Sequence, residues 1–392
     1  MGLFKGFDKV SRQDWLDKIT ADLKGKDFNE TLVWNSKEGI DVQPFYNSDT
    51  NIQSTTPLKP FNSWKIREKI TIQSIKKANQ EALLALKGGA NSILFIGEIN
   101  SQKEMNELLS EIQTEIIEIH FYNSNPKKTS TFIKLNRGSI SYDYLSEAYL
   151  SKNDSIDKNI DDLAENTSSN TNIKTITVNG VNYANNGFSL SEEIGLSLAQ
   201  AVEYFNLLID RGIKPSKIAN SIQFSFGIET NYFFEIAKIR AARKLWDIIL
   251  EQYQVTDTTM DIHSETTITK NSEEDNNYDI LRNTTKAMSA IIGGCDSLTI
   301  LPHDDSETNI GFSNRIARNI QHILKEEAFF DKVNNPADGA YYIEELTDKI
   351  ASKSWTFFQE IEKKGGFLAC IDKGVIKNEE DAISWLKSID IK

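Results

Sequence analysis

The sequence predicts an α/β fold: a parallel (β/α)8 (TIM) barrel, partly eroded, with an N-terminal arm and C-terminal helices. Short β-rich runs alternate with longer helical periods through most of the chain. About eight such alternations, spread over roughly 250 residues or more, are typical of a closed parallel barrel. The 392 residues are 39% hydrophobic and 10% aromatic, which is ample material for a packed core. A doubly wound parallel sheet is the alternative architecture.

The expected strands are 64–70, 92–96, 115–122, either 131–136 or 139–142, 175–178, 222–226, 259–263 and 297–301. Helices with an apolar face are expected at 71–87, 101–113, 156–164, 191–211, 229–252 and 278–292. The third connection is the weak point, because 123–130 (NSNPKKTS) is too polar and broken for a crossover helix. We expect the barrel to be eroded at that corner.

Residues 1–55 are interpreted as an arm rather than a domain, because they hold apolar anchors but too little chain to enclose them. The arm should begin with an amphipathic helix at 11–24, capped by Ser11, and continue with a short strand at 31–34. We therefore expect the arm to pack on its own barrel or on another subunit.

The barrel domain is assigned to residues 56–345, and a C-terminal helical segment to 346–392. Long helices are expected at 310–327 and 341–364, followed by one more at 378–386.

Charge and composition exclude several classes of protein. The 44 basic and 57 acidic residues give a net charge of −13, and no basic stripe is present, so nucleic acid is not an expected partner. No apolar run approaches the roughly 20 residues that span a bilayer, and no signal peptide is evident, so we expect a cytoplasmic protein without membrane contact. The two cysteines, Cys295 and Cys370, form no C-x-x-C pair and predict no metal site.

With four histidines, the catalytic inventory is small. His263 closes a predicted strand in MDIHSETT, and barrel enzymes place their chemistry at the carboxyl ends of strands. A strand-end histidine is more often a hydrogen-bonded core residue, so both interpretations stay open. The triplet 303–305 (HDD) is typical of a solvated turn rather than a metal site. No G-x-S-x-G, P-loop or G-x-G-x-x-G motif is present.

The densest pattern is QFSFGIETNYFFEIAKIRAARKLWDIIL, residues 223–250. It predicts a strand, a tight turn at Gly227 and a long helix. On that helix the apolar residues Phe233, Ile236, Ile239, Leu245 and Trp246 should face the barrel, and the basic residues Lys238, Arg240, Arg243 and Lys244 should face outward or toward a partner.

This segment resembles the barrel of methylmalonyl-CoA mutases, whose hallmark there reads approximately FFFGIGMNFFMEIAKLRAARLLW. The likeness continues along the chain in the same order. LVWNSKEGIDVQPFY (32–46) is similar to the family's arm, SWKIREKI (63–70) to its PWTIRQYA strand and MDIHSETT (260–267) to its RTHCQTSG strand. SNRIARNIQHILKEE (313–327) and NPADGAYYIEELTDKIASKSW (335–355) are similar to its later helices.

This chain departs from the family pattern at positions to which the resemblance assigns a role in binding or catalysis. Lys69 stands where the family has a tyrosine that orders the radical pair, and Asn62 where it has an arginine for the CoA phosphates. Ala184 and Glu265 replace two glutamines, while His263 keeps the histidine that hydrogen-bonds the thioester. The chain ends where the family's cobalamin-binding domain would begin. The resemblance therefore implies degenerate positions, with no catalytic and no cofactor-binding residue in this chain.

This pattern is similar to that of the small, non-catalytic subunit of a heterodimeric, adenosylcobalamin-dependent methylmalonyl-CoA mutase. The resemblance implies that a large partner subunit binds adenosylcobalamin and interconverts methylmalonyl-CoA and succinyl-CoA. Alone, this chain should be inactive, and it could form a homodimer. The alternative is a minimal mutase-like or CoA-thioester-binding barrel enzyme that uses a separate cobalamin-binding chain, with Lys69 and His263 as its working residues.

The resemblance also bears on the barrel axis. In active relatives the CoA tail threads the barrel between small side chains. Here we expect the axis to be blocked or narrowed by branched and aromatic residues.

Overall fold

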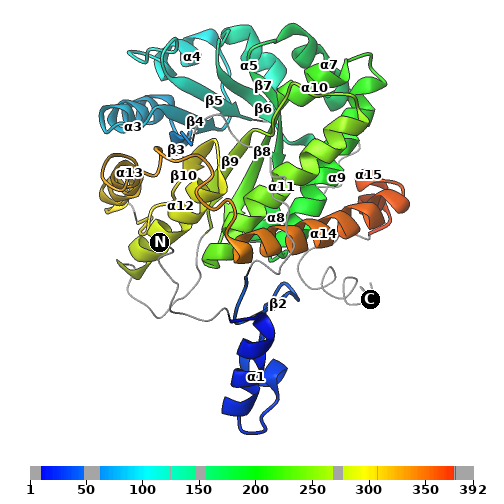
Figure 1. Ribbon diagram of the computed structural model, residues 1–392. Helices are drawn as coiled ribbons and strands as arrows, with labels where there is room; N and C mark the ends of the chain where they lie inside the picture. Colours follow the sequence, from blue (N-terminus) through cyan, green and yellow to red (C-terminus); the bar gives the residue numbers. More distant parts are fainter. Residues whose placement is uncertain are drawn as a thin grey trace, which may run out of the picture.

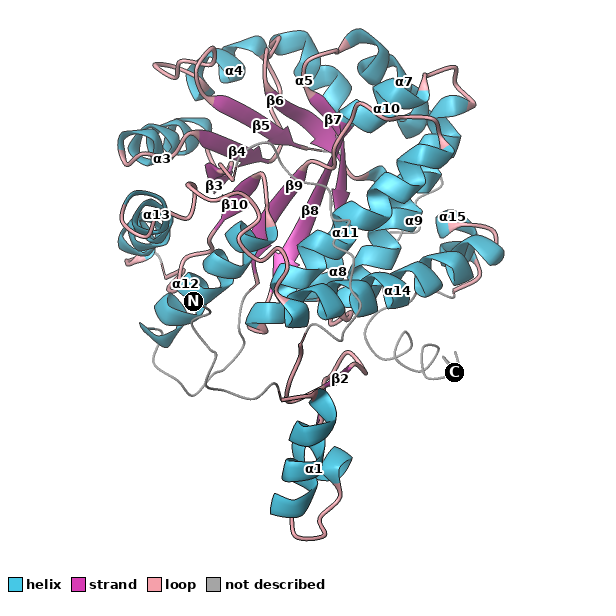
Figure 2. Cartoon of the chain, in the orientation of Figure 1, coloured by secondary structure: helices cyan, strands magenta, loops and turns pink. Residues whose placement is uncertain are grey.

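The computed structural model describes residues 10–47, 62–123, 125–146, 156–267, 277–306, 308–374 and 376. Its centre is a closed barrel of parallel strands in the order β10-β3-β4-β5-β6-β7-β8-β9, surrounded by helices (Figures 1 and 2). The strands are β3 (Lys65–Thr71), β4 (Ser92–Ile96), β5 (Glu118–Tyr122), β6 (Gly138–Tyr142), β7 (Lys174–Asn179), β8 (Ile222–Ile228), β9 (Ile262–Thr266) and β10 (Ser297–Thr299). Closure confirms the predicted TIM-barrel class and excludes the open doubly wound sheet.

The barrel helices follow the predicted alternation. They are α3 (Ile75–Lys87), α4 (Gln102–Leu108), α5 (Pro126–Phe132), α7 (Ile156–Ser169), α8 (Gly180–Asn185), α9 (Leu190–Ile209), α10 (Pro215–Ser221), α11 (Tyr232–Gln252), α12 (Asn277–Gly293) and α13 (Ile310–Glu326). Two further helices, α14 (Tyr341–Lys363) and α15 (Phe367–Asp372), follow. The expected helix at 378–386 lies outside the described residues. Among the helices that are described, none is long and apolar enough to cross a bilayer.

The third connection contains a helix, α5, so the expectation of no crossover helix there is wrong. Asn125 caps α5, its side chain accepting a hydrogen bond of 3.0 Å from the Lys128 backbone N–H, and Pro126 occupies the first turn. Only Pro126 and Thr129 of this helix are buried. A helix that buries so little needs few apolar residues, which is why its sequence looked like a loop.

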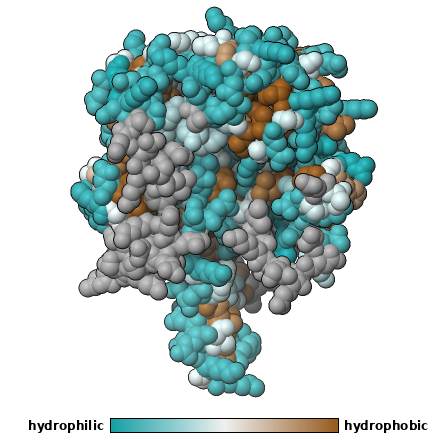
Figure 3. Space-filling model, turned by 180° about the vertical axis from the view of Figure 1, so that it is seen from behind, coloured by the Kyte–Doolittle hydropathy of each residue, from teal (hydrophilic) through white to brown (hydrophobic). Residues whose placement is uncertain are grey.

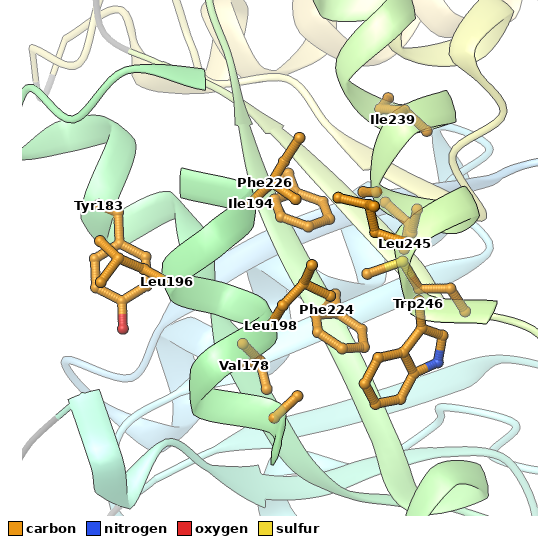
Figure 4. Close-up of a cluster of buried hydrophobic side chains, with 14 of the residues drawn as sticks. Val178, Tyr183, Ile194, Leu196, Leu198, Phe224, Phe226, Ile239, Leu245 and Trp246 are labelled. Carbon is orange, nitrogen blue, oxygen red and sulfur yellow. The ribbon is translucent and has the colours of Figure 1, made fainter. Parts of the chain in front are cut away.

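The main core lies between the strands and the helices, not inside the barrel. Along β8, Phe224 and Phe226 alternate with Gln223 and Ser225, and the two phenylalanines point outward toward α9 and α11 (Figure 4). The ring centroids of Phe224 and Trp246 are 4.8 Å apart. Because side chains alternate across a strand, apolar residues facing the helices leave polar residues facing the lumen.

Three of the four basic residues on α11 are buried, so their expected outward placement is wrong. Lys238 is 0% exposed, and its Nζ lies 2.8 Å from carboxylate oxygens of both Glu193 and Glu235. The Lys238 ammonium also donates to the carbonyl of Gly227, and the Glu193 carboxylate accepts from the Gly227 N–H at 2.8 Å. The cluster therefore ties α9 and α11 to the end of β8.

Arg240 and Arg243 are also paired inside the protein. Arg240 Nη2 lies 2.6 Å from Glu344 Oε1 of α14, and Arg243 Nη2 lies 2.7 Å from Asp296 Oδ2. The helix faces were misassigned because these cations are buried against neighbouring carboxylates, as charged groups must be when they leave water. Phe233, expected to face the barrel, is 47% exposed.

The arm contains α1 (Arg12–Asp22), α2 (Phe28–Leu32), β1 (Trp34–Asn35) and β2 (Asp41–Val42). The predicted cap is confirmed, because the Ser11 side chain accepts from Asp14 N–H while the Asp14 carboxylate accepts from Ser11 N–H. The strand expected at 31–34 is wrong in its first half, which belongs to α2. Helices α1 and α2 extend away from the barrel and bury none of their residues (Figure 1).

The antiparallel β1–β2 hairpin fixes the arm to the body. The Glu38 carboxylate accepts a hydrogen bond of 3.1 Å from the N–H of Leu190, at the start of α9. Lys353 of α14 donates to the Glu38 carbonyl at 2.5 Å. The ring centroids of Trp34 and Phe234 are 5.8 Å apart. The arm is therefore anchored at residues 34–46, and 10–32 project beyond that anchor.

Candidate functional site

In the part of the chain that the structure describes, one cavity lies at each end of the barrel interior. The upper chamber, of about 120 Å³, lies at the carboxyl ends of the strands, where Lys69, His263 and Glu265 line it. The lower basin, of about 960 Å³, lies at the amino ends and is lined by residues such as Lys65 and Trp64. Arg67 and Gln223 line both cavities, so one layer of side chains separates them.

Arg67 forms the centre of this layer. Its Nε donates to Ser92 Oγ at 3.0 Å, its Nη1 donates to Gln223 Oε1 at 3.0 Å, and its Nη2 lies 2.9 Å from His120 Nε2. His120 Nδ1 in turn lies 2.9 Å from Ser139 Oγ. These residues come from β3, β4, β5, β6 and β8, so the layer spans the lumen. The axis is closed by polar residues, and the expectation of branched and aromatic filling is wrong.

Burial sets the protonation of the layer. It lowers the pKa of Arg67 to about 10, so the guanidinium stays charged at neutral pH. It also lowers the pKa of His120 to about 4, with a further lowering from the nearby Arg67. His120 is therefore neutral at neutral pH and can accept a hydrogen bond from Arg67. The positive charge of the layer is that of Arg67, whose hydrogen-bond partners Ser92, Gln223 and His120 are neutral.

Lys69 and Glu265 face each other across the upper chamber. Lys69 Nζ lies 2.8 Å from Glu265 Oε1 and 3.0 Å from Oε2. The side chain of Glu265 is 7% exposed and that of Lys69 is 32% exposed. Their strands, β3 and β9, both neighbour β10, so the pair bridges one strand. The carboxylate of Glu265 thus neutralises the ammonium group of Lys69 at this end of the barrel.

His263 lies beside this pair with one nitrogen unused. Its Nδ1 lies 2.9 Å from Ser297 Oγ, whereas its Nε2 is buried and has no hydrogen-bond partner among the described residues. Burial lowers the pKa of His263 well below its ordinary value, and the positive charge of Arg67 adds to this effect. His263 is therefore a neutral imidazole at the chamber wall.

Of the five degenerate positions predicted from the sequence, the structure brings three together: Lys69, His263 and Glu265. Asn62 is elsewhere, its Nδ2 donating to the carbonyl of Phe330 at 2.6 Å. Ala184, on α8, is buried against Gly227, where an added Cβ would come within 2.6 Å of the Ala184 Cβ. Neither Asn62 nor Ala184 is among the described residues that line the two cavities.

Arg67, Gln223 and His120, which form this layer, were not among the site residues predicted from the sequence. The sequence did contain a signal for a charged lumen. Lys65, Arg67 and Lys69 occupy alternate positions along β3 and must therefore share one face of the strand. The described residues contain no cluster of three or more His, Cys, Asp or Glu side chains suited to a metal ion. Asp304 instead accepts from the backbone N–H of Ser306 at 2.9 Å, consistent with the predicted turn.

Comparisons with known proteins give a consistent family. The family model described as methylmalonyl-CoA mutase matches residues 98–391. A methylmalonyl-CoA mutase small subunit from Porphyromonas gingivalis is 34% identical over 418 residues, covering 97% of this chain and 67% of that protein. A small subunit from Streptomyces virginiae is 36% identical over 216 residues, covering 54% of this chain and 35% of that protein. A methylmalonyl-CoA mutase from Rhizobium meliloti is 27% identical over 426 residues, covering 92% of this chain and 60% of that protein.

This chain therefore spans 35% to 67% of the length of these three relatives. Among solved structures, dihydropteroate synthase from Yersinia pestis matches with a TM-score of 0.40 and 11% sequence identity, covering 66% of this chain and 92% of that chain. That likeness carries no functional argument.

Proposed function

We propose that this chain, which belongs to the methylmalonyl-CoA mutase family, is a non-catalytic structural subunit of a heterodimeric methylmalonyl-CoA mutase. In this proposal a large partner subunit binds adenosylcobalamin and interconverts methylmalonyl-CoA and succinyl-CoA. This chain supplies an interface and stabilises that partner.

The observation that carries the proposal is the closed barrel axis. An acyl-CoA whose tail runs along the lumen would have to displace Arg67, which is bonded to Ser92, Gln223 and His120. Displacing it would leave a buried charge and its acceptors without partners, at a cost of several kcal/mol by the usual penalty for broken buried polar pairs. The residues of this barrel therefore do not fit a threaded CoA ester.

The upper chamber supports the same proposal. Lys69 is already neutralised by Glu265, whose carboxylate would repel a carboxylate-bearing acyl group in this small space. We assign no catalytic step to this chain and no cofactor to its residues.

The projecting part of the arm supports a partner. The rings of Trp15 and Phe45 are tilted by 31° with their centroids 5.0 Å apart, and Trp15 meets Phe28 edge-on at 6.5 Å, yet none of these three residues is buried. Seen from behind, the projecting arm shows hydrophobic residues among hydrophilic ones at its surface (Figure 3). Aromatic side chains that a short hairpin cannot cover are typical anchors of subunit interfaces.

Two measurements test the proposal. Co-expression with a large mutase subunit, followed by size-exclusion chromatography, should give one complex at equal stoichiometry. Titration of this chain alone with succinyl-CoA should leave its tryptophan fluorescence unchanged, and Trp64, which lines the lower basin, is a suitable reporter. Quenching that saturates with succinyl-CoA would favour the alternative, a CoA-thioester-binding barrel. Separate elution of the two chains would contradict the subunit role.

A further inference from the structure

Four aromatic side chains form a continuous group, the body rings, where the arm joins the body. The ring centroids of Tyr46 and Tyr342 are 5.1 Å apart, those of Tyr342 and Phe233 are 5.4 Å apart, and those of Phe233 and Tyr232 are 5.2 Å apart. None of the four side chains is buried, and Phe233 is 47% exposed. Contiguous exposed apolar groups, unlike scattered ones, mark sites of interaction.

The body rings continue the aromatic surface of the arm. Tyr46 directly follows Phe45, whose ring centroid lies 5.0 Å from that of Trp15 on α1. Phe233 lies in the first turn of α11, and Tyr342 lies in the first turn of α14. Helix α11 follows β8 and therefore begins at the carboxyl end of the barrel, which is the end from which the arm projects (Figure 1). Rings of the arm and rings of the body thus meet at one end of the molecule.

The projecting helices are too small to form a whole subunit interface. A standard interface covers about 800 Å², or roughly 20–30 residues, on each partner. Helices α1 and α2 contain 11 and 5 residues, and only part of their surface can face one partner. A partner that covers Trp15 and Phe45 must therefore also contact the body. The body rings begin at the next residue after Phe45, so they fall within such a footprint.

The charge of the chain bears on which partner covers these rings. The net charge is −13, so two copies of this chain repel each other. The body rings are uncharged and cannot offset that repulsion. Burial raises the pKa of Tyr342 to about 12, which keeps its phenol neutral. A different chain with an apolar patch of its own is therefore a better match than a second copy.

We infer that the body rings are a second contact surface for the large mutase subunit, which covers them together with the rings of Trp15 and Phe45. The partner is that of the proposed function, on which this inference rests. The contact is distinct from that of the projecting arm, because the body rings remain when residues 1–32 are removed. Aromatic side chains at the centre of an interface typically contribute most to its binding free energy.

Calorimetric titration of the full chain with a purified large subunit tests this contact. Phe233→Ser should weaken association at least tenfold, because it removes a ring that contacts two others of the group. Ile248→Ser is the matched control, since Ile248 is 37% exposed and lies in the carboxyl-terminal half of the same helix. The control should leave the affinity unchanged. The melting temperature of each free variant should stay close to that of the wild type.

Hydrogen exchange of the wild-type complex provides a second measurement that needs no variant. The first N–H groups of a helix have no intrahelical partner, so those at the starts of α11 and α14 should exchange readily in the free chain. Binding of the large subunit should slow their exchange together with that of α1.

The outcomes distinguish this contact from the proposed function. Failure of the wild-type chains to associate would contradict both. Association that Trp15→Ser weakens, but that Phe233→Ser and Ile248→Ser leave equally strong, would contradict only the contact at the body rings. Unchanged hydrogen exchange at the starts of α11 and α14 would do the same. A dimer of this chain alone that Phe233→Ser dissociates would show that a second copy covers the rings, and would overturn the choice of partner.

Discussion

Arg67 Nη1 donates a hydrogen bond of 3.0 Å to Gln223 Oε1 across the interior of the barrel. Arg67 belongs to β3 and Gln223 to β8, and β10 and β9 stand between those strands in the ring. The bond therefore crosses the lumen rather than running along its wall. It divides one potential channel into an upper chamber and a lower basin, and this division underlies the proposed lack of activity.

Replacing Arg67 should therefore affect stability as well as access. Arg67→Met removes three hydrogen bonds and leaves Gln223 and His120 with unsatisfied atoms, so we expect a loss of roughly 2–4 kcal/mol in the free energy of unfolding. Urea denaturation followed by circular dichroism measures it. Lys65 lies on β3, like Arg67, and forms a partly exposed ion pair with Glu118 of β5. Lys65→Met should therefore cost no more than about 1 kcal/mol. Equal losses in the two variants would contradict a structural role for the layer.

The paired arginines of α11 predict a second contrast. Arg240→Met should cost about 3–5 kcal/mol, because it leaves the carboxylate of Glu344 buried without its cation. Lys244→Met lies on the same helix, but Lys244 and its partner Asp348 are partly exposed, so we expect a change below about 1 kcal/mol. Thermal or urea unfolding of both variants decides this. If the Arg240 variant were as stable as the Lys244 variant, Arg240 would not form a buried ion pair with Glu344, and the prediction that its side chain faces outward would be correct.

The Glu193 cluster predicts a dependence of stability on pH. Burial raises the pKa of Glu193 to about 7, although Lys238 opposes the shift. The folded protein therefore binds a proton that the unfolded chain releases near its ordinary pKa of about 4.3. Its contribution to stability is fully present below that value and is lost as pH rises through about 7.

The neutral variant Glu193→Gln has a single amide oxygen, which can take the place of only one of the two carboxylate oxygens that accept from Gly227 and Lys238. It cannot titrate and should remove this dependence. Urea midpoints of both proteins at pH 5, 6, 7 and 8 provide the measurement. The wild type should lose stability relative to the variant as the pH rises. Parallel curves would show that Glu193 does not titrate in this range.

Deleting residues 1–32 should weaken assembly without unfolding the barrel. The deletion removes α1 and α2, which bury no residues, and keeps Trp34 and Glu38, which anchor the arm to the body. We expect a smaller fraction of this chain to co-purify with a large mutase subunit and an almost unchanged melting temperature for this chain alone. Trp15→Ser tests the same idea at one side chain, with the exposed Lys18→Ser as its control. Unchanged co-purification of the deletion variant would refute the role of the arm.

The elements that could be predicted were those in which polar and apolar residues recur with a regular period. Strand β8 alternates Gln223, Phe224, Ser225 and Phe226, and that alternation is visible without any structure. The α1 cap at Ser11 was equally local, since a cap needs only the backbone N–H three residues ahead. Helix α5 was missed because it buries only Pro126 and Thr129, which leaves no apolar face to detect.

The candidate site was predicted only in part, for a related reason. Lys69, His263 and Glu265 were found through their positions in a family pattern, and the structure brings them together. Nothing in the linear sequence says that Arg67 of β3 meets Gln223 of β8, since the two are 156 positions apart. The buried pairing of Arg240 with Glu344, separated by 104 positions, was hidden in the same way.

The sequence alone determined the alternation of strands and helices, the barrel class and the family, because these depend on local periodicity and on blocks of residues in order. The tertiary structure alone decided which charges are buried, that the lumen is polar and closed, and which degenerate positions share a chamber. Closing the sheet brings side chains from distant strands within hydrogen-bonding distance. The charge on Arg67 or Lys238 can be retained in the interior only because partners from other elements meet it there.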